Sequence, residues 1–325
     1  MPAVYTVRHC CGNNAAFSTK LIACRTNKHN MASVNSLNVA AAQGTAGLHL
    51  LVEEIDKLVS LPDIYYRLEE AIVDPGSTTD SIAELLRSDP DLCARMLRMA
   101  NSAFYSFPTT IETIERAVST IGLRQIRELV LVTAVIKAFE GIPPEKVDMA
   151  SFWEHSVAVG ILAREIGQAG GIPGAQSFYI PGLLHDLGRL VMYLKLPALM
   201  NDLLDQRESS GRAMHELEHE VLSYSHADIG GCLLAFWKLP PSICEPVTTH
   251  HNPAEGGEFM LSACAIHIAD AWVNSNQIGS SGDRFELDIS DEALALVGVD
   301  LEAVEAAASS AAEQIRAVAR QFMGH

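Results

Sequence analysis

The chain has 325 residues, of which 48% are hydrophobic, 19% charged and only 6% aromatic, and its formal net charge is −17. This balance excludes a largely disordered protein, and the length is sufficient to bury a sizeable core. The negative charge disfavours nucleic acid and anionic lipid as partners, and the longest apolar run (129–136) is too short to cross a bilayer.

Residues 1–47 differ from the rest of the chain, because they contain four basic residues and no Asp or Glu. They show no sustained periodicity, and no apolar stretch long enough for a secretory signal is present. We expect a disordered tail here. An organellar transit peptide is the alternative, and Met31 is an alternative start of the protein.

From Leu48 onward, apolar residues recur with a helical period, and no strand pattern is recognisable. Asp89 followed by Pro90 predicts a helix start, Thr79 or Asp80 is the expected cap of the preceding helix, and Gly122 is an expected left-handed C-terminal cap. In this first half, helices are predicted near 51–59, 65–73, 79–86, 90–100, 113–121 and 123–139.

The stretch 141–144 (Gly-Ile-Pro-Pro) is the expected internal boundary. Beyond it, helices are predicted near 147–168, 177–195, 198–208, 213–223, 226–237, 241–250 and 259–275. A Gly-Ser loop at 279–282 precedes a final pair of helices, the last over 300–322. The sequence thus predicts an all-α protein with a tail (1–47), a first helical half (48–140), a second helical half (145–275) and C-terminal helices (283–325). Without strands, P-loop and Rossmann chemistry is excluded.

The seven cysteines form no CxxC motif, and their number is odd. The last four lie in apolar helical segments, where a reduced thiol behaves as a small hydrophobic side chain. A reducing, cytoplasmic location is therefore expected.

Potential metal ligands follow one another along the second half. In chain order they are His155, His185, Asp186, His226, His250, His251 and Asp270. Imidazole and carboxylate bind Fe, Mn, Ni, Co or Zn, and a bridging carboxylate allows two ions to activate a water for attack on phosphorus. Taken singly, each histidine could equally be a helix cap or a solvated helix end. The joint order favours one shared metal site.

Several longer segments carry a resemblance to a known family. They are Leu61-Pro62-Asp63, residues 89–105, residues 114–127, residues 152–156, residues 182–190 and residues 226–230. With them, the chain resembles the HDOD (HD-related output) domains of the HD metal-dependent phosphohydrolase superfamily over about residues 50–275.

The resemblance implies an all-α architecture in which an N-terminal helical subdomain packs on an HD-like helical subdomain. It also implies a cytoplasmic bacterial signalling module, often non-catalytic, that binds a signalling protein partner or a nucleotide-like ligand. A receiver domain needs alternating strands and helices, which this chain does not show, so we expect it to act with a separate partner.

Residue by residue, the resemblance places His155, His185, Asp186 and Asp270 on the basic HD metal motif. It places His226, His250 and His251 on the additional ligands of the HD-GYP cyclic-dinucleotide phosphodiesterases. If the protein is an enzyme, Asp186 and Arg189 are the expected catalytic residues.

Two departures from HD-GYP enzymes argue against cyclic di-GMP hydrolysis. The Asp-Gly-x-Gly-Tyr-Pro signature is missing after His251, and Arg189 stands where those enzymes usually have lysine. Two hypotheses stay open: a regulatory binding module with an HD-type metal site, and an active metal-dependent phosphohydrolase acting on a nucleotide or cyclic dinucleotide. A purely structural helical scaffold leaves the order of the ligands unexplained.

Two other patterns have simpler interpretations. Residues 215–219 (His-Glu-Leu-Glu-His) fit the helical zinc-protease motif, but they fit the exposed acidic face of a helix equally well. Arg116, Arg124, Arg127 and Lys137 could bind an anion, although a solvated helix face is the usual role of such a cluster.

Overall fold

The computed structural model describes residues 43–56, 59–101, 110–140, 142, 147–282 and 289–322. Among these residues every regular element is a helix, which confirms the all-α prediction. Several predicted features lie outside the described residues: most of the expected tail with Met31, residues 102–105 of the family motif, and all but Ile142 of the expected boundary at 141–144.

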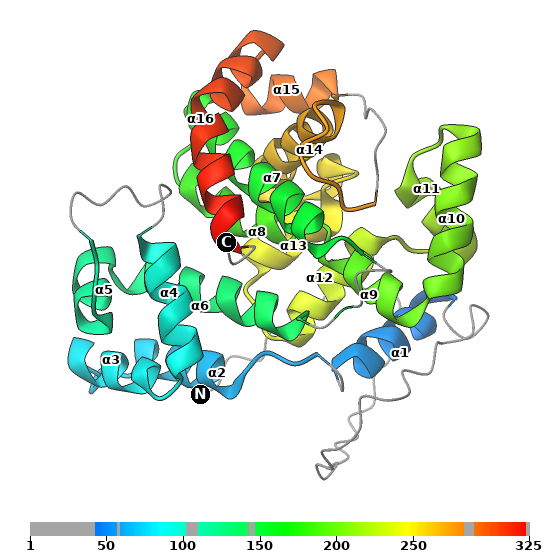
Figure 1. The fold of residues 1–325 in the computed structure, drawn as a ribbon. Helices are drawn as coiled ribbons and strands as arrows, with labels where there is room; N and C mark the ends of the chain where they lie inside the picture. The colour runs from blue at the N-terminus through cyan, green and yellow to red at the C-terminus, as the bar shows by residue number, and fades with distance from the viewer. Residues whose placement is uncertain are drawn as a thin grey trace.

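The first half supplies six helices to the described structure. They are α1 (Gly44–Asp56), α2 (Asp63–Val73), α3 (Thr79–Arg87), α4 (Pro90–Ala100), α5 (Ile114–Ile121) and α6 (Leu123–Ala138). Helix α1 begins ahead of Leu48, within the last residues of the expected tail, and it packs on α9 and α12 of the second half. Helices α2–α6 gather at one end of the molecule (Figure 1).

Helix starts in this half follow local capping chemistry. The Asp89 side chain accepts a hydrogen bond from the Leu92 amide at 3.0 Å, as expected for a cap ahead of Pro90. The predicted cap of α3 is wrong by one residue, because Thr78 caps it through a reciprocal pair of bonds with Ser81. Gly122 has φ 86° but ψ 157°, so it leaves the helical range without adopting the left-handed cap.

The second half surrounds a central helix, α7 (Met149–Ala169), which contacts α8, α14 and α16. The other helices are α8 (Tyr179–Leu184), α9 (Leu187–Lys195), α10 (Pro197–Ser210), α11 (Met214–Leu222), α12 (His226–Phe236), α13 (Pro241–Thr249), α14 (Met260–Ser275), α15 (Asp291–Val297) and α16 (Leu301–Phe322), with 3-10 turns η2 (Ala175–Phe178), η3 (Pro253–Glu255) and η4 (Gly257–Phe259). Helices α10 and α11 lie at the edge of the molecule, on the side away from α3–α5 (Figure 1).

The single helix predicted over 177–195 is wrong. The structure has η2 and two helices there, and the break between α8 and α9 falls at His185 and Asp186. Asp186 has φ −97° and ψ 10°, outside the helical range, and its carbonyl accepts from the Arg189 amide at 2.9 Å in a tighter turn. The periodicity of apolar residues continues across this turn, so the sequence pattern does not reveal it.

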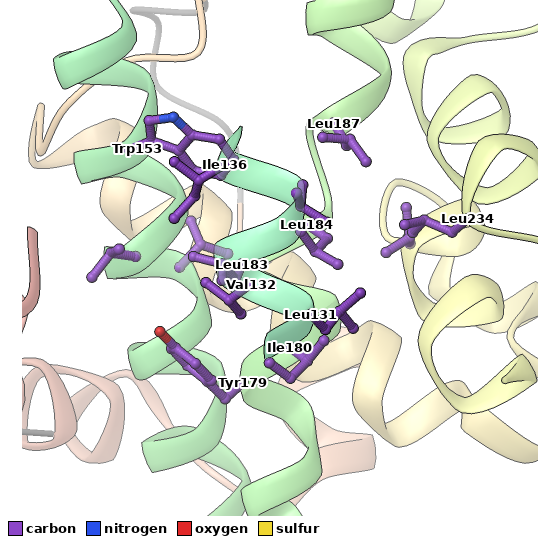
Figure 2. Close-up of a cluster of buried hydrophobic side chains, with 14 of the residues drawn as sticks. Leu131, Val132, Ile136, Trp153, Tyr179, Ile180, Leu183, Leu184, Leu187 and Leu234 are labelled. Carbon is purple, nitrogen blue, oxygen red and sulfur yellow. The ribbon is translucent and has the colours of Figure 1, made fainter. Parts of the chain in front are cut away.

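The two halves share one apolar core. Leu131 and Val132 of α6 lie beside Ile180, Leu183 and Leu184 of α8, and all five side chains are buried (Figure 2). Burial of this kind stabilises the fold by roughly 25 cal/mol for each Å² of apolar surface removed from water. The first half therefore packs directly on the segment that leads into His185 and Asp186.

None of the helices in the described ranges is long and apolar enough to span a bilayer. The four cysteines within those ranges are free thiols, as expected from their apolar settings: Cys93, Cys232, Cys244 and Cys264.

Replacing Leu183 by Ala should lower the free energy of unfolding by about 2–5 kcal/mol, because it opens a cavity where α6 meets α8. Urea unfolding followed by circular dichroism measures this change. Leu301→Ala is the matched control, since Leu301 is 55% exposed and should cost much less. Equal losses in the two variants would contradict close packing of Leu183 between α6 and α8.

Candidate metal centre

Two glycines allow α7 and α8 to approach closely. A Cβ atom on Gly160 would lie 2.7 Å from the Tyr179 carbonyl oxygen, and one on Gly182 would lie 2.9 Å from the Gly160 Cα. Only glycine fits such an approach. As a result, the Nε2 atoms of His155 and His185 come within 3.4 Å of each other.

A second close approach joins α9 to α12. A side chain on Gly188 would overlap the His226 carbonyl oxygen and would lie 2.8 Å from the Gly230 amide nitrogen. The crossing brings the turn at Asp186 against the first residue of α12. The Asp186 Oδ1 atom lies 3.1 Å from the His226 Nε2 atom.

The first group of potential ligands contains His155, His185 and Asp270, and it is fully enclosed. Asp270 Oδ1 lies 3.2 Å from His155 Nε2 and 3.5 Å from His185 Nε2. Asp186 Oδ2 lies 3.6 Å and 3.3 Å from the same two nitrogens. Helices α7 and α14 and the turn between α8 and α9 therefore direct four side chains toward a common point.

The second group contains His226, His250 and His251. The Nε2 atoms of His226 and His251 are 2.8 Å apart, and the buried Nε2 atom of His250 has no hydrogen-bond partner in the part of the chain that the structure describes. Asp186 joins this group through Oδ1 and the first group through Oδ2. Its carboxylate thus lies between the two groups.

In three of these histidines, a hydrogen bond from Nδ1 fixes the orientation of the ring. His185 Nδ1 donates to the Gly182 carbonyl at 2.8 Å, and His250 Nδ1 donates to the Val247 carbonyl at 2.7 Å. His226 Nδ1 donates to the Glu218 carboxylate at 2.6 Å. Such partners orient an imidazole so that its other nitrogen is available to a metal ion.

Charge compensation explains how two carboxylates stay ionised in the interior. Burial raises the pKa of Asp270, but hydrogen bonds from His155 and His185 outweigh burial and hold that pKa well below its usual range. Arg189 Nε donates to Asp186 Oδ1 at 2.9 Å, and with His185 it lowers the pKa of Asp186 against the effect of burial.

The pKa of His185 shifts in the opposite direction to those of His250 and His251. Burial lowers the pKa of His185, but Asp186 and Asp270 outweigh it and raise the pKa to about 10. Burial and the neighbouring imidazoles hold the pKa of both His250 and His251 well below the ordinary value, so these rings are neutral. A divalent ion would replace the proton on His185 as the compensating charge.

The structure therefore brings all seven predicted ligands together, with Arg189 beside them. Five imidazoles and two carboxylates form a donor set that fits divalent first-row metal ions, and the buried, unpartnered His250 Nε2 atom is a further sign of that fit. The arrangement could hold two ions. The role of each residue as a ligand stays a prediction.

Glu218 is a site residue that was not predicted from the sequence. Its side chain is fully buried, so the interpretation of 215–219 as an exposed acidic face is wrong at this position. Glu218 lies four residues from both Met214 and Leu222, which are also buried, and this i, i+4, i+8 pattern was a usable signal. His219 is exposed, whereas the His215 ring stacks on His251 with centroids 4.0 Å apart. The two histidines of the protease motif therefore have different surroundings.

The basic cluster of the first half makes ion pairs. Arg127 Nε lies 2.6 Å from Glu69, and Lys137 lies 3.1 Å from Asp91. These pairs agree with a solvated helix face.

A cavity of about 580 Å³ opens beside the second group. His251 and His215 line it together with Arg212, Thr248 and Asn252. Of the second group, His251 lines this cavity, whereas His226 and His250 are fully buried, as are the side chains of the first group.

Comparison with known proteins identifies the fold. The HDOD domain family model matches residues 58–253. An HDOD domain protein of Geobacter sulfurreducens is 24% identical, with a TM-score of 0.66 over 84% of this chain and 97% of that one. These two findings confirm the predicted HDOD architecture.

Further relatives carry functional names of their own. A protein of Shewanella amazonensis, named as a candidate phosphohydrolase, is 25% identical with a TM-score of 0.63 over 85% of this chain and all of that one. A candidate signal transduction protein of Marinobacter aquaeolei is 22% identical with a TM-score of 0.63, over 90% of this chain and 68% of that one.

A curated relative, an uncharacterized protein of Treponema pallidum, is 26% identical over 203 residues. The matched stretch covers 62% of this chain and 39% of the relative, so the chain spans about two fifths of that protein's length.

Gly188→Ala should destabilise the protein by about 1–3 kcal/mol and weaken metal uptake, because the added methyl group forces α9 and α12 apart. Urea unfolding and elemental analysis measure the two effects. The control is Gly76→Ala, since Gly76 is exposed and has room for a methyl group. A Gly188→Ala protein that matched this control would show that the close approach is not required.

Metal binding should become tighter as the pH rises from about 6 to 8. His185, with its pKa raised to about 10, is protonated across this range and must lose its proton to bind a metal. The association constant for Mn²⁺ should therefore rise by up to roughly tenfold per pH unit. Calorimetric titrations in buffers of different ionisation enthalpy measure the proton released, and a pH-independent constant would contradict this account.

Proposed function

The chain belongs to the HDOD family, and from this membership and the converging ligands we propose that it is a signalling module that binds two divalent metal ions. One observation carries the proposal. The two oxygens of the Asp186 carboxylate face two different groups of histidines, which is the arrangement of a bridging ligand.

In this proposal the candidate ligands are divided between two metal ions. His155, His185 and Asp270 hold one ion, and His226, His250 and His251 hold the other. Asp186 bridges the two, and Arg189 compensates its charge from the side. A pair of divalent ions supplies Lewis acidity and can activate a bound water. The donor types favour Fe, Mn, Ni, Co or Zn.

The signalling role rests on the family and on the cavity beside His251. A cavity of about 580 Å³ is large enough for a nucleotide-sized ligand, and ligand pockets typically fall between about 300 and 1,000 Å³. We propose a nucleotide-like ligand or a signalling protein as the partner. The Marinobacter relative is named as a candidate signal transduction protein, which supports the signalling role. The cytoplasmic location stays a prediction.

A second candidate function is hydrolysis of a phosphate ester by the same residues. The cavity favours it, because an ester bound there would lie next to His251 and the second group of ligands. The Shewanella relative is named as a candidate phosphohydrolase, which supports the same candidate. Asp186 and Arg189 are the proposed catalytic residues, through the bridging carboxylate and its charge partner.

Elemental analysis of the purified protein tests the metal proposal. The wild type should carry close to two equivalents of a first-row metal after anaerobic reconstitution. Asp186→Ala should lose both ions, and His251→Ala should lose one, because His251 belongs to the second group alone. His219→Ala is the control, since His219 is exposed on the same helix as Glu218 and should keep both ions. A wild type without metal would refute the proposal.

Hydrolysis of bis(4-nitrophenyl) phosphate separates the two candidate functions. Turnover by the metal-loaded wild type that disappears in Asp186→Ala would establish the phosphohydrolase. If the loaded wild type binds a nucleotide by calorimetry without hydrolysing either compound, the protein is a binding module.

A further inference from the structure

Helix α11 contributes to the candidate metal centre through a residue outside the ligand set. The Glu218 side chain is fully buried, and one of its oxygens, Oε2, accepts two hydrogen bonds from His226. The His226 amide donates at 2.8 Å, and the His226 Nδ1 atom donates at 2.6 Å. The other oxygen, Oε1, is buried and has no hydrogen-bond partner within the described ranges.

The position of His226 explains why it needs a partner from elsewhere. His185 and His250 each donate Nδ1 to the carbonyl three residues earlier, within their own turn of chain. His226 is the first residue of α12, and the chain before it is not helical, since Ser223 has φ 68° and Ser225 is extended. No preceding helical turn of α12 can therefore orient its ring.

Glu218 is itself held firmly. Met214, Leu217 and Leu222 anchor the inner face of α11 in the core, and this places Glu218 toward α12. Because both hydrogen bonds use the same oxygen, they fix the ring of His226 relative to its own backbone. The His226 Nε2 atom then points to Asp186 Oδ1 at 3.1 Å.

We propose that Glu218 is a positioning residue for the second of the two ions, which it serves by holding His226 with Nε2 directed into the site. The inference rests on the proposed function, since that ion is itself proposed. A carboxylate behind a ligating histidine also makes the imidazole a stronger donor. In the described part of the chain, Glu218 makes its hydrogen bonds to His226 and none to His155, His185 or Asp270, so its effect is confined to one of the two ions.

Two substitutions separate the charge of Glu218 from its shape. Glu218→Gln keeps an oxygen that can accept from His226 but removes the charge, and Glu218→Ala removes both. Each should weaken binding of the second ion by roughly ten- to a hundredfold, the usual effect of removing such a partner, and leave the first ion unchanged. Glu220→Gln is the matched control, because Glu220 is an exposed glutamate on the same helix.

Calorimetric titration with Mn²⁺ gives the two affinities, and Co²⁺ absorption spectra report the coordination of each ion. A merely structural role would lower the urea midpoint of the metal-free protein and weaken both ions together. Loss confined to the second ion, with a smaller loss in Glu218→Gln than in Glu218→Ala, supports positioning. Equal weakening of both ions, or unchanged binding in Glu218→Ala, would overturn it.

Proton NMR of the metal-free, ¹⁵N-histidine-labelled protein tests the contact without any ion. The short bond to Glu218 should give a downfield His226 Nδ1 proton that persists in Glu220→Gln and disappears in Glu218→Ala. If the wild type bound no metal yet showed this dependence, only the proposed function would fail. If it bound two ions and showed no such dependence, only the role of Glu218 would fail.

Discussion

The buried carboxylate of Asp186 requires compensating charge, because an isolated carboxylate in a protein interior is very costly. The structure meets this requirement with Arg189 on one side and with the imidazoles of His155 in α7 and His226 in α12 on the other. Removing one partner would leave an uncompensated charge, so the surrounding helices must keep their relative positions. The charge balance of the site and the packing of the helices in the second half therefore depend on each other.

The packing also depends on close backbone contacts at three glycines, beside the contacts of the ligand side chains. Gly160 and Gly182 let α7 approach α8, and Gly188 lets α9 approach α12. Each crossing lies within a few residues of the ligands that it brings together. The sequence around His185 and Asp186 thus serves two purposes, since the same short segment supplies ligands and the space for the neighbouring helix.

Much of the fold could be predicted from the sequence, because amphipathic periodicity and capping residues are local signals. The order of histidines and aspartates likewise indicated which side chains would meet. The turn at Asp186 could not be predicted, since apolar residues continue on both sides of it and its side chain contacts His155 and His226, which are far away in the sequence. Glu218 was misjudged because acidic residues crowd 215–220, although its spacing from Met214 and Leu222 placed it on the inner face.

Helix α11 is attached mainly to α10 and α12 and lies at the edge of the molecule (Figure 1). Its Glu218 nevertheless makes direct contact with a candidate ligand. Coupling between two binding events is reciprocal. A molecule that bound the α10–α11 edge and shifted Glu218 away from His226 would lower metal affinity by some factor, and the metal would lower that molecule's affinity by the same factor. The α10–α11 edge and the buried metal centre would then be two allosterically coupled binding sites.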